Sequence, residues 1–155
     1  MTIDALDARL LRLLAGQPRI GVLEASRRLS VARGTVQARL DRLVARGVIR
    51  GFGPEVDPAA LGFGVTAYAT LEIRQGAGLA VAERLAGLPQ VLEAVTITGQ
   101  GDLLCRVVAR SNADLQELID ELTAVDGVQR TATVIALSVR IPPRLLPLID
   151  LAATP

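Results

Sequence analysis

The sequence predicts an α+β protein in which a helical N-terminal third precedes a domain of alternating strands and helices. Apolar residues recur at helical spacing as far as residue 46, and they alternate with a period of two from Val65 onward. The net charge also changes sign. Residues 1–51 hold ten arginines against four acidic residues, a net charge of +6, whereas residues 52–155 hold seven against twelve, a net charge of −5. A basic N-terminal third of this kind is typical of a DNA-binding domain fused to a second domain.

The composition limits the class of protein and the kinds of site. Half of the 155 residues are apolar, which is typical of a globular protein. No apolar run approaches the roughly 20 residues of a membrane-spanning helix, and the N-terminus lacks the order of a signal peptide, so we expect a cytoplasmic protein without membrane contacts. The chain has no histidine and a single cysteine, Cys105, for which an apolar neighbourhood predicts an inert core thiol. We therefore expect no catalytic site, no metal and no cofactor.

The first predicted element is a helix from about Asp4 to Ala15. Asp4 followed by Asp7 is a carboxylate variant of the capping box, which favours a helix start. Gly16, Gln17 and Pro18 then end the helix. Between these limits an apolar face is formed by Leu6, Leu10, Leu13 and Leu14.

Residues 22–47 predict two short helices joined by a tight turn. The first runs from about Val22 to Leu29 and the second from about Arg33 to Arg46, with Gly47 as the residue that ends it. The second helix has an apolar stripe, and its other face carries small and polar residues that suit a DNA groove. Small residues let the backbone approach, while Thr, Gln and Arg side chains reach base edges or phosphates. A plain helical hairpin with a solvated charged face is the alternative interpretation.

The β-branched residues and glycines of residues 48–53 predict a strand and turn, which would form a wing along the duplex backbone. A winged helix–turn–helix domain would then cover residues 1–53, and the prolines of residues 54–63 predict a short, stiff linker. Arg50 would contact phosphate from the wing or would only be solvated. The candidate DNA contacts are Arg33, Gly34, Thr35, Gln37, Ala38, Arg39, Arg42 and Arg50.

The remaining pattern predicts a ferredoxin-like βαββαβ sandwich over residues 64–140. Its strands are expected at residues 65–73, 91–98, 102–109 and 128–140, and its helices at residues 79–88 and 111–122. In this arrangement both helices cover one face of an antiparallel sheet. The other face stays open, which predicts pairing with another subunit. The residues expected on that open face include Tyr68, Leu104, Val108, Val134 and Ala136.

The tail, residues 141–155, contains four prolines and cannot form one continuous helix. Its leucines and isoleucines predict that it docks on an apolar surface, with a neighbouring subunit as one candidate. A loosely held chain end is the alternative.

Several short motifs follow one another in a specific order, although none is strong alone. They are Ile3-Asp4-x-x-Asp7-x-x-Leu10-Leu11, Val36-x-x-Arg39-Leu40-x-x-Leu43-x-x-x-Gly47-Val48-Ile49, Asp57-Pro58-x-x-Leu61-Gly62, Thr98-Gly99-x-x-Asp102-Leu103-Leu104 and Gly127-Val128-x-x-Thr131-x-Thr133. Over about residues 3–140 their order and spacing closely resemble the Lrp/AsnC family, the feast/famine regulators of bacteria and archaea.

This resemblance implies a sequence-specific DNA-binding transcriptional regulator whose second domain senses a small effector, commonly a free amino acid bound at a subunit interface. Family members form homodimers that assemble further, commonly into octamers. Glycines let a ligand approach the backbone, and Asp102 would accept from an ammonium group or hold the turn. The effector-binding candidates are Thr98, Gly99, Gln100, Gly101, Asp102, Leu103, Val134, Ile135 and Ala136.

The chain departs from the family pattern at the start of the predicted DNA-reading helix. Ala32 stands where a serine or threonine usually caps this helix, and Gly34 inside the helix costs roughly 1 kcal/mol relative to alanine. Both features predict a first turn that becomes firm only on DNA. Two other functions remain as alternatives. One is a ligand-independent architectural DNA-binding protein, and the other is an enzyme that resembles the sirohaem decarboxylases, although those enzymes rely on histidine.

Overall fold

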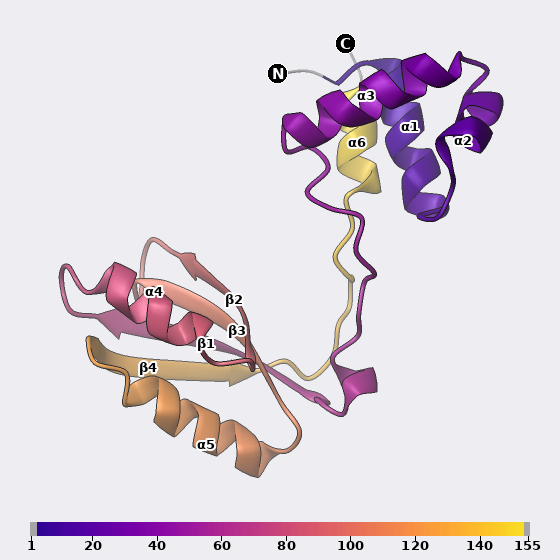
Figure 1. The fold of residues 1–155 in the computed structure, drawn as a ribbon. Coiled ribbons are helices and arrows are strands. Elements are labelled where there is room, and N and C mark those ends of the chain that lie inside the picture. The colour runs from indigo at the N-terminus through magenta and orange to yellow at the C-terminus, as the bar shows by residue number, and fades with distance from the viewer. Residues whose placement is uncertain (1–2, 154–155) are drawn as a thin grey trace. The chain divides into compact units, whose positions relative to one another are not determined.

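The computed structural model describes residues 3–153 and divides them into two compact units. The first unit contains residues 3–54 together with residues 141–153 of the tail, and the second contains residues 55–140. Figure 1 labels the helices and strands of both units.

The first unit is helical, as the sequence predicts. It consists of α1 (Ala5–Gly16), α2 (Val22–Leu29), α3 (Arg33–Ala45) and the tail helix α6 (Leu146–Ala152). The capping box is present, because the Asp4 carboxylate accepts from the N–H groups of Leu6 and Asp7 at 2.9 Å and the Asp7 carboxylate accepts from the N–H of Asp4 at 3.2 Å. The buried core of this unit is formed by Leu10, Ala25, Leu29, Val36 and Leu43.

The strand expected in residues 48–53 does not form, so this part of the prediction is wrong. The N–H groups of Val48 and Ile49 both donate to the carbonyl oxygen of Leu43, at 2.9 and 3.2 Å, and thereby close the end of α3. Ile49 packs against the helical core, while residues 50–57 form neither helix nor strand and are exposed. A strand needs a hydrogen-bonded neighbour, and no other described segment pairs with these residues.

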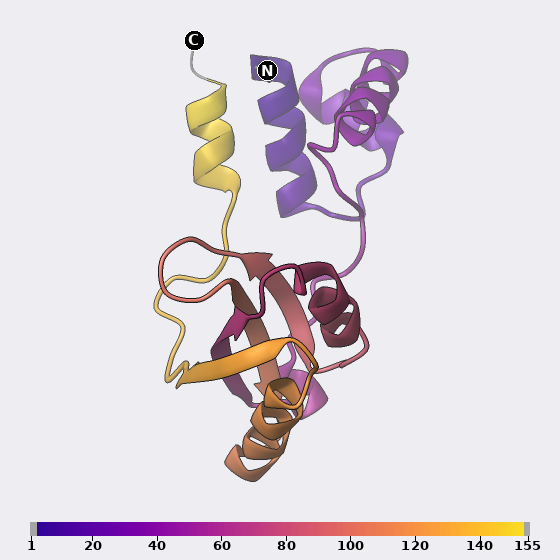
Figure 2. The same ribbon diagram turned by 90° about the vertical axis from the view of Figure 1, so that its left-hand side faces the viewer.

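The tail docks on its own chain. After Pro142 and Pro143 it forms α6, which packs against α1, and Figure 2 shows the two helices running side by side. An ion pair between Arg12 of α1 and Asp150 of α6 joins them. The tail is therefore not one continuous helix, as predicted, and α6 lies against α1 of its own chain. Its leucines stay exposed, with Leu148 at 58% and Leu151 at 73%, so docking on an apolar surface remains a prediction.

The second unit is a four-stranded antiparallel sheet with strand order β2-β3-β1-β4, which confirms the ferredoxin-like arrangement. The strands are β1 (Val65–Ile73), β2 (Val91–Thr96), β3 (Leu103–Ala109) and β4 (Val128–Ile135). The helices are α4 (Gly78–Ala86) and α5 (Asn112–Thr123), and a short 3-10 helix (Ala59–Leu61) precedes β1.

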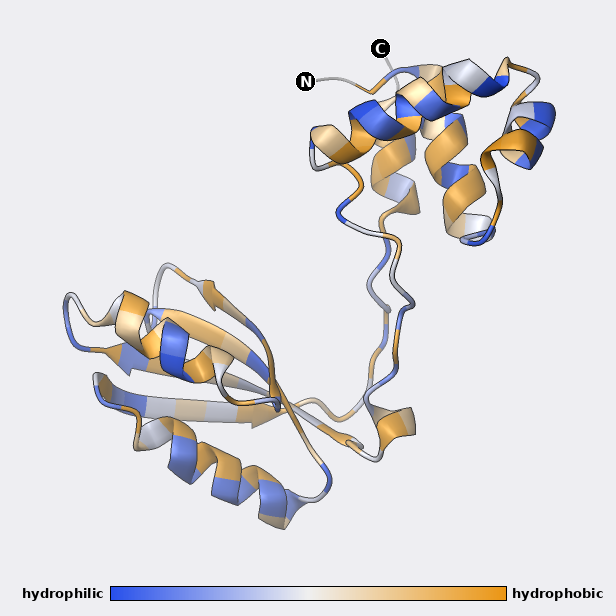
Figure 3. Cartoon of the chain, viewed as in Figure 1, coloured by the Kyte–Doolittle hydropathy of each residue, from blue (hydrophilic) through white to orange (hydrophobic). Residues whose placement is uncertain are grey.

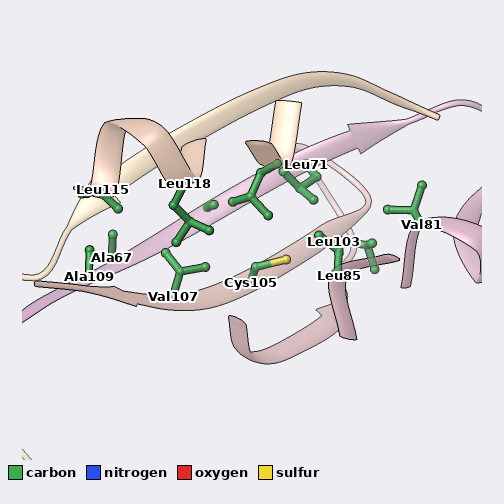
Figure 4. Close-up of a cluster of buried hydrophobic side chains, with 12 residues drawn as sticks. Ala67, Leu71, Val81, Leu85, Leu103, Cys105, Val107, Ala109, Leu115 and Leu118 are labelled. Carbon is green, nitrogen blue, oxygen red and sulfur yellow. The ribbon is translucent and has the colours of Figure 1, made fainter. Parts of the chain in front are cut away.

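The core of the second unit lies between one face of the sheet and both helices. Figure 4 shows Leu115 and Leu118 of α5 lying over strand residues that include Val107 and Cys105. Figure 3 shows the mixture of hydrophilic and hydrophobic residues along α5, as expected of a helix with one buried face. The fully buried side chains of this core include Ala67, Ala69, Leu71, Val81, Leu85, Cys105, Val107 and Leu122.

The opposite face of the sheet carries no helix and contains large apolar side chains. Tyr68 of β1 is paired with Val134 of β4, and Val134 is 66% exposed. Strand β4 ends at Ile135 rather than at Arg140, and its pairing with β1 stops at Ala67, two residues after β1 begins. Ala136 donates a last hydrogen bond to the carbonyl oxygen of Thr66, and residues 137–140 have no neighbouring strand among the described residues.

Candidate functional site

The outward face of α3 contains a shallow hollow of about 470 Å³. Val36 and Leu43 face the core, which turns the small and polar residues of the first two turns toward solvent. A Cβ atom added at Gly34 would meet no atom within 4 Å, so the packing of the protein does not require glycine there. The hollow is lined by Gly34, Thr35, Ala38, Arg39 and Arg42.

The start of α3 has the weak cap that the sequence predicts. Ala32 has extended backbone at the N-cap position and provides no side-chain hydrogen bond to the helix. Gln37 is exposed on the next turn, where its amide donates to the carboxylate of Asp41 at 2.8 Å. This bond holds the Gln37 side chain along the helix surface.

Two arginines of α3 are ion-paired with α1. The carboxylate of Asp7 is 4% exposed and accepts from Nη2 of Arg42 at 2.7 and 2.9 Å and from Nη1 of Arg39 at 3.0 Å. Asp4 is 51% exposed and also accepts from Nη1 of Arg39. Hydrogen bonding to the Arg39 guanidinium group, followed by the N–H of Asp7, lowers the pKa of the Asp4 carboxyl group from its usual value. The same two carboxylates raise the pKa of Arg39, so Asp4 and Arg39 are both charged at neutral pH.

The sequence identified Asp4 and Asp7 only as capping residues and did not predict these ion pairs. The structure thus brings Arg39 and Arg42 to the hollow with Gly34, Thr35 and Ala38, but it also gives both arginines carboxylate partners. Arg33 and Arg50 are different, because both are exposed and have no ion-pair partner within residues 3–153. Local spacing does not link residues 4 and 7 to residues 39 and 42, because the contacts join residues more than 30 positions apart in the sequence.

The turn between β2 and β3, residues 97–102, is closed by backbone hydrogen bonds. The N–H of Ile97 donates to the carbonyl oxygen of Asp102 at 3.0 Å, and the N–H of Asp102 donates to that of Leu71 at 2.8 Å. Gly99 and Gly101 have φ angles of +101° and +86°, a region that favours glycine. The Asp102 carboxylate accepts from the N–H of Ile73 at 2.7 Å, and therefore helps to hold the turn against β1.

The two predicted groups of effector residues lie at opposite ends of β1. The turn of residues 98–102 adjoins Leu71, the β1 partner of Leu103, whereas Ile135 pairs with Ala67 near the start of that strand. Leu103 is buried in the core, and Val134 lies on the open face. One chain therefore does not bring all nine candidates together.

Residues 3–153 give little support for a reactive cysteine, a metal site or a membrane-spanning helix. Cys105 is buried, and burial raises the pKa of its thiol, which keeps the sulfur in its unreactive protonated form. Residues 3–153 contain no group of three or more His, Cys, Asp or Glu side chains placed to hold a metal ion. No helix in this range has both the length and the apolar character needed to cross a membrane.

Comparison with known proteins places both units in described families. Residues 3–50 match the winged helix-turn-helix DNA-binding family, and residues 66–146 match the Lrp/AsnC ligand binding domain. An uncharacterised HTH-type transcriptional regulator of Pyrococcus abyssi is 35% identical over 89% of this chain and 88% of its own length.

Solved structures show the same similarity. The structure of E. coli AsnC is 28% identical and superimposes with a TM-score of 0.86 over 95% of this chain and 100% of that chain. A transcriptional regulator of Neisseria meningitidis, solved as a complex with L-Met, is 25% identical with a TM-score of 0.85 over 97% and 99%. These relatives are transcriptional regulators and not enzymes, which removes the decarboxylase alternative. The chain therefore belongs to the Lrp/AsnC family of DNA-binding transcriptional regulators.

Proposed function

We propose that this regulator binds operator DNA through the outward face of α3, and that a small effector, an amino acid, adjusts this binding. The hollow on α3 carries the proposal. It combines an open backbone at Gly34 with the small side chain of Ala38 and two guanidinium groups, those of Arg39 and Arg42. Thr35 and Gln37 would reach base edges, while Arg33, Arg39, Arg42 and Arg50 would contact phosphates.

Gly34→Ala separates helix stability from DNA binding. The new methyl group meets open space within the protein, so we expect it to stabilise α3 by up to about 1 kcal/mol. On DNA the same methyl group would hold the helix away from the groove, and we expect affinity to fall on the order of tenfold. Urea unfolding and fluorescence anisotropy with a duplex from upstream of the protein's own gene measure the two effects.

The matched control for this variant is Gly78→Ala in α4 of the other unit. An added Cβ there would lie 3.6 Å from a terminal carbon of Ile73, an ordinary contact, so only stability should change. A Gly34→Ala protein that gains stability and keeps full DNA affinity would show that DNA does not approach this part of α3.

We also propose that the open sheet face forms a homodimer interface. Tyr68, Val95 and Val134 leave 38%, 41% and 66% of their surface exposed on this face. Arg106 extends from the same face of β3, and its buried Nε has no hydrogen-bond partner among the described residues. A second copy of the chain would cover the apolar side chains and offer a hydrogen-bond acceptor to the Nε–H of Arg106. The dimers would assemble further, as octamers.

The effector would bind beside the exposed turn residues Thr98, Gly99 and Gln100. Gly101 and Asp102 would hold the turn, since both are engaged with β1. Because Val134, Ile135 and Ala136 lie at the other end of β1, they would complete such a site only from another subunit. The L-Met complex of the Neisseria regulator supports an amino acid as the ligand class.

A thermal-shift screen of the free amino acids tests this effector proposal. We expect one or a few amino acids at about 100 times their dissociation constant to stabilise the assembled protein by about 2.7 kcal/mol, and to change its DNA affinity. If every amino acid leaves both the melting temperature and the DNA affinity unchanged, the ligand-independent architectural alternative is favoured.

A further inference from the structure

The cluster formed by Asp4, Asp7, Arg39 and Arg42 has no net charge. Its two carboxylates and two guanidinium groups lie within ion-pair distance, including Arg42 Nη2 and Asp4 at 3.9 Å. Salt-dependent DNA binding arises when cationic side chains neutralise phosphates and release counterions. A neutral cluster contributes little to this effect, so Arg39 brings its full positive charge to a phosphate only if one carboxylate releases it.

The two carboxylates differ in how easily they can release their arginine partners. Asp7 is 4% exposed, bonds to both arginines and accepts from the N–H of Asp4, so releasing it would leave a buried charge without a partner. Asp4 is 51% exposed, and its other bonds, to the N–H groups of Leu6 and Asp7, come from Oδ1 rather than from the Oδ2 atom that meets Arg39. Asp4 can therefore release Arg39 and still cap α1.

The two guanidinium groups also keep donors for a further acceptor. Within residues 3–153, the carboxylates engage only Nη1 of Arg39 and only Nη2 of Arg42. The remaining N–H groups belong to side chains that line the hollow on α3. Two N–H donors on one guanidinium group match the spacing of two phosphate oxygens.

We propose that Asp4 pairs with Arg39 in the free protein, where a DNA phosphate would otherwise bind, and that it releases Arg39 when DNA binds. Asp7 stays in place and keeps both arginines beside the hollow. Asp4 thereby lowers the affinity of the regulator for duplex DNA of any sequence. This inference rests on the proposed phosphate contact of Arg39.

The test uses the full chain, the variant Asp4→Asn and a labelled mixed-sequence duplex about 30 base pairs long. Asparagine keeps an oxygen that caps α1, so the fold is retained while the negative charge beside Arg39 is lost. We expect the affinity for this duplex to rise about three- to tenfold at low salt, and the slope of log affinity against log salt to steepen by about one unit between about 50 and 200 mM salt.

The matched control is Glu24→Gln. Glu24 is another half-exposed carboxylate of the same unit that is paired with arginines, Arg27 and Arg28, which lie outside the hollow. It measures the general effect of removing one negative charge. Equal effects of Asp4→Asn and Glu24→Gln on affinity and slope would overturn the inference.

A double-mutant cycle with Arg39→Ala distinguishes the two proposals. Arg39→Ala alone should lower the salt slope by about one unit, and adding Asp4→Asn to it should then have no more effect than Glu24→Gln. An unchanged slope in Arg39→Ala would refute the phosphate contact of Arg39 itself. A lower slope in Arg39→Ala, combined with an Asp4→Asn effect that persists without Arg39, would refute only the role of Asp4.

Discussion

Val134→Arg should prevent formation of the proposed homodimer and leave the protein monomeric. Val134 is 66% exposed at the open sheet face, directly opposite Tyr68 on the neighbouring strand. In a two-fold interface the substitution would place an arginine from each subunit on the same apolar surface. Burying these charges without partners costs several kcal/mol, so we expect the dimer to weaken on the order of 100-fold or more. Light scattering after size-exclusion chromatography gives the mass directly.

The matched control for this variant is Gln116→Arg on α5. It adds the same charge at an exposed position on the helix-covered side of the sheet. We expect it to leave the mass unchanged. A folded Val134→Arg protein with the mass of the unmodified assembly would show that subunits meet through another surface. If it is monomeric, its DNA affinity should also fall, because one protomer offers only one α3 to the duplex.

Gly101→Ala should destabilise the second unit by about 3 kcal/mol. Its φ of +86° costs an L-residue about 1–2 kcal/mol. The added Cβ would also overlap the Cγ2 methyl of Thr70 and lie 3.3 Å from the carbonyl oxygen of Leu71. Relieving this overlap needs a shift of the Thr70 side chain or of the turn against β1, which adds about 1–3 kcal/mol. Urea unfolding of the variant measures the sum.

Gly99→Ala provides the comparison, because Gly99 shares the unusual backbone but not the close approach. Its φ is +101°, yet an added Cβ would meet no atom within 4 Å. We expect only the conformational cost, about 1–2 kcal/mol. Equal losses of stability in the two variants would show that Gly101 is needed for its backbone conformation alone and not for its approach to β1.

The two substitutions would also distinguish an effect on folding stability from an effect on effector binding. Gly99 lies in open space beside Thr98 and Gln100, where a ligand could meet the backbone, whereas Gly101 is covered by Thr70 and Leu71. The motif in the sequence gave both glycines the same role. Only the path of β1 beneath the turn distinguishes a glycine required for packing from one available to an effector.

Local pattern was sufficient for most of the secondary structure. The helix pair was predicted at residues 22–29 and 33–46 and is found at Val22–Leu29 and Arg33–Ala45, because the apolar stripe and Gly47 are local signals. The βαββαβ order was predicted in the same way. The wrong predictions concern segments that need a partner distant in sequence. Residues 48–53 have no strand to pair with among the described residues, and β4 stops at Ile135, where its pairing with β1 stops.

The sequence by itself thus determined the family, the order of the elements and the outward face of α3, since periodicity and charge are properties of neighbouring residues. Tertiary structure decided which charges on that face are already paired. The capping residues Asp4 and Asp7 meet arginines more than 30 positions away, and Asp150 in the tail meets Arg12. Such contacts depend on how helices pack against one another, and spacing along the chain carries no information about that packing.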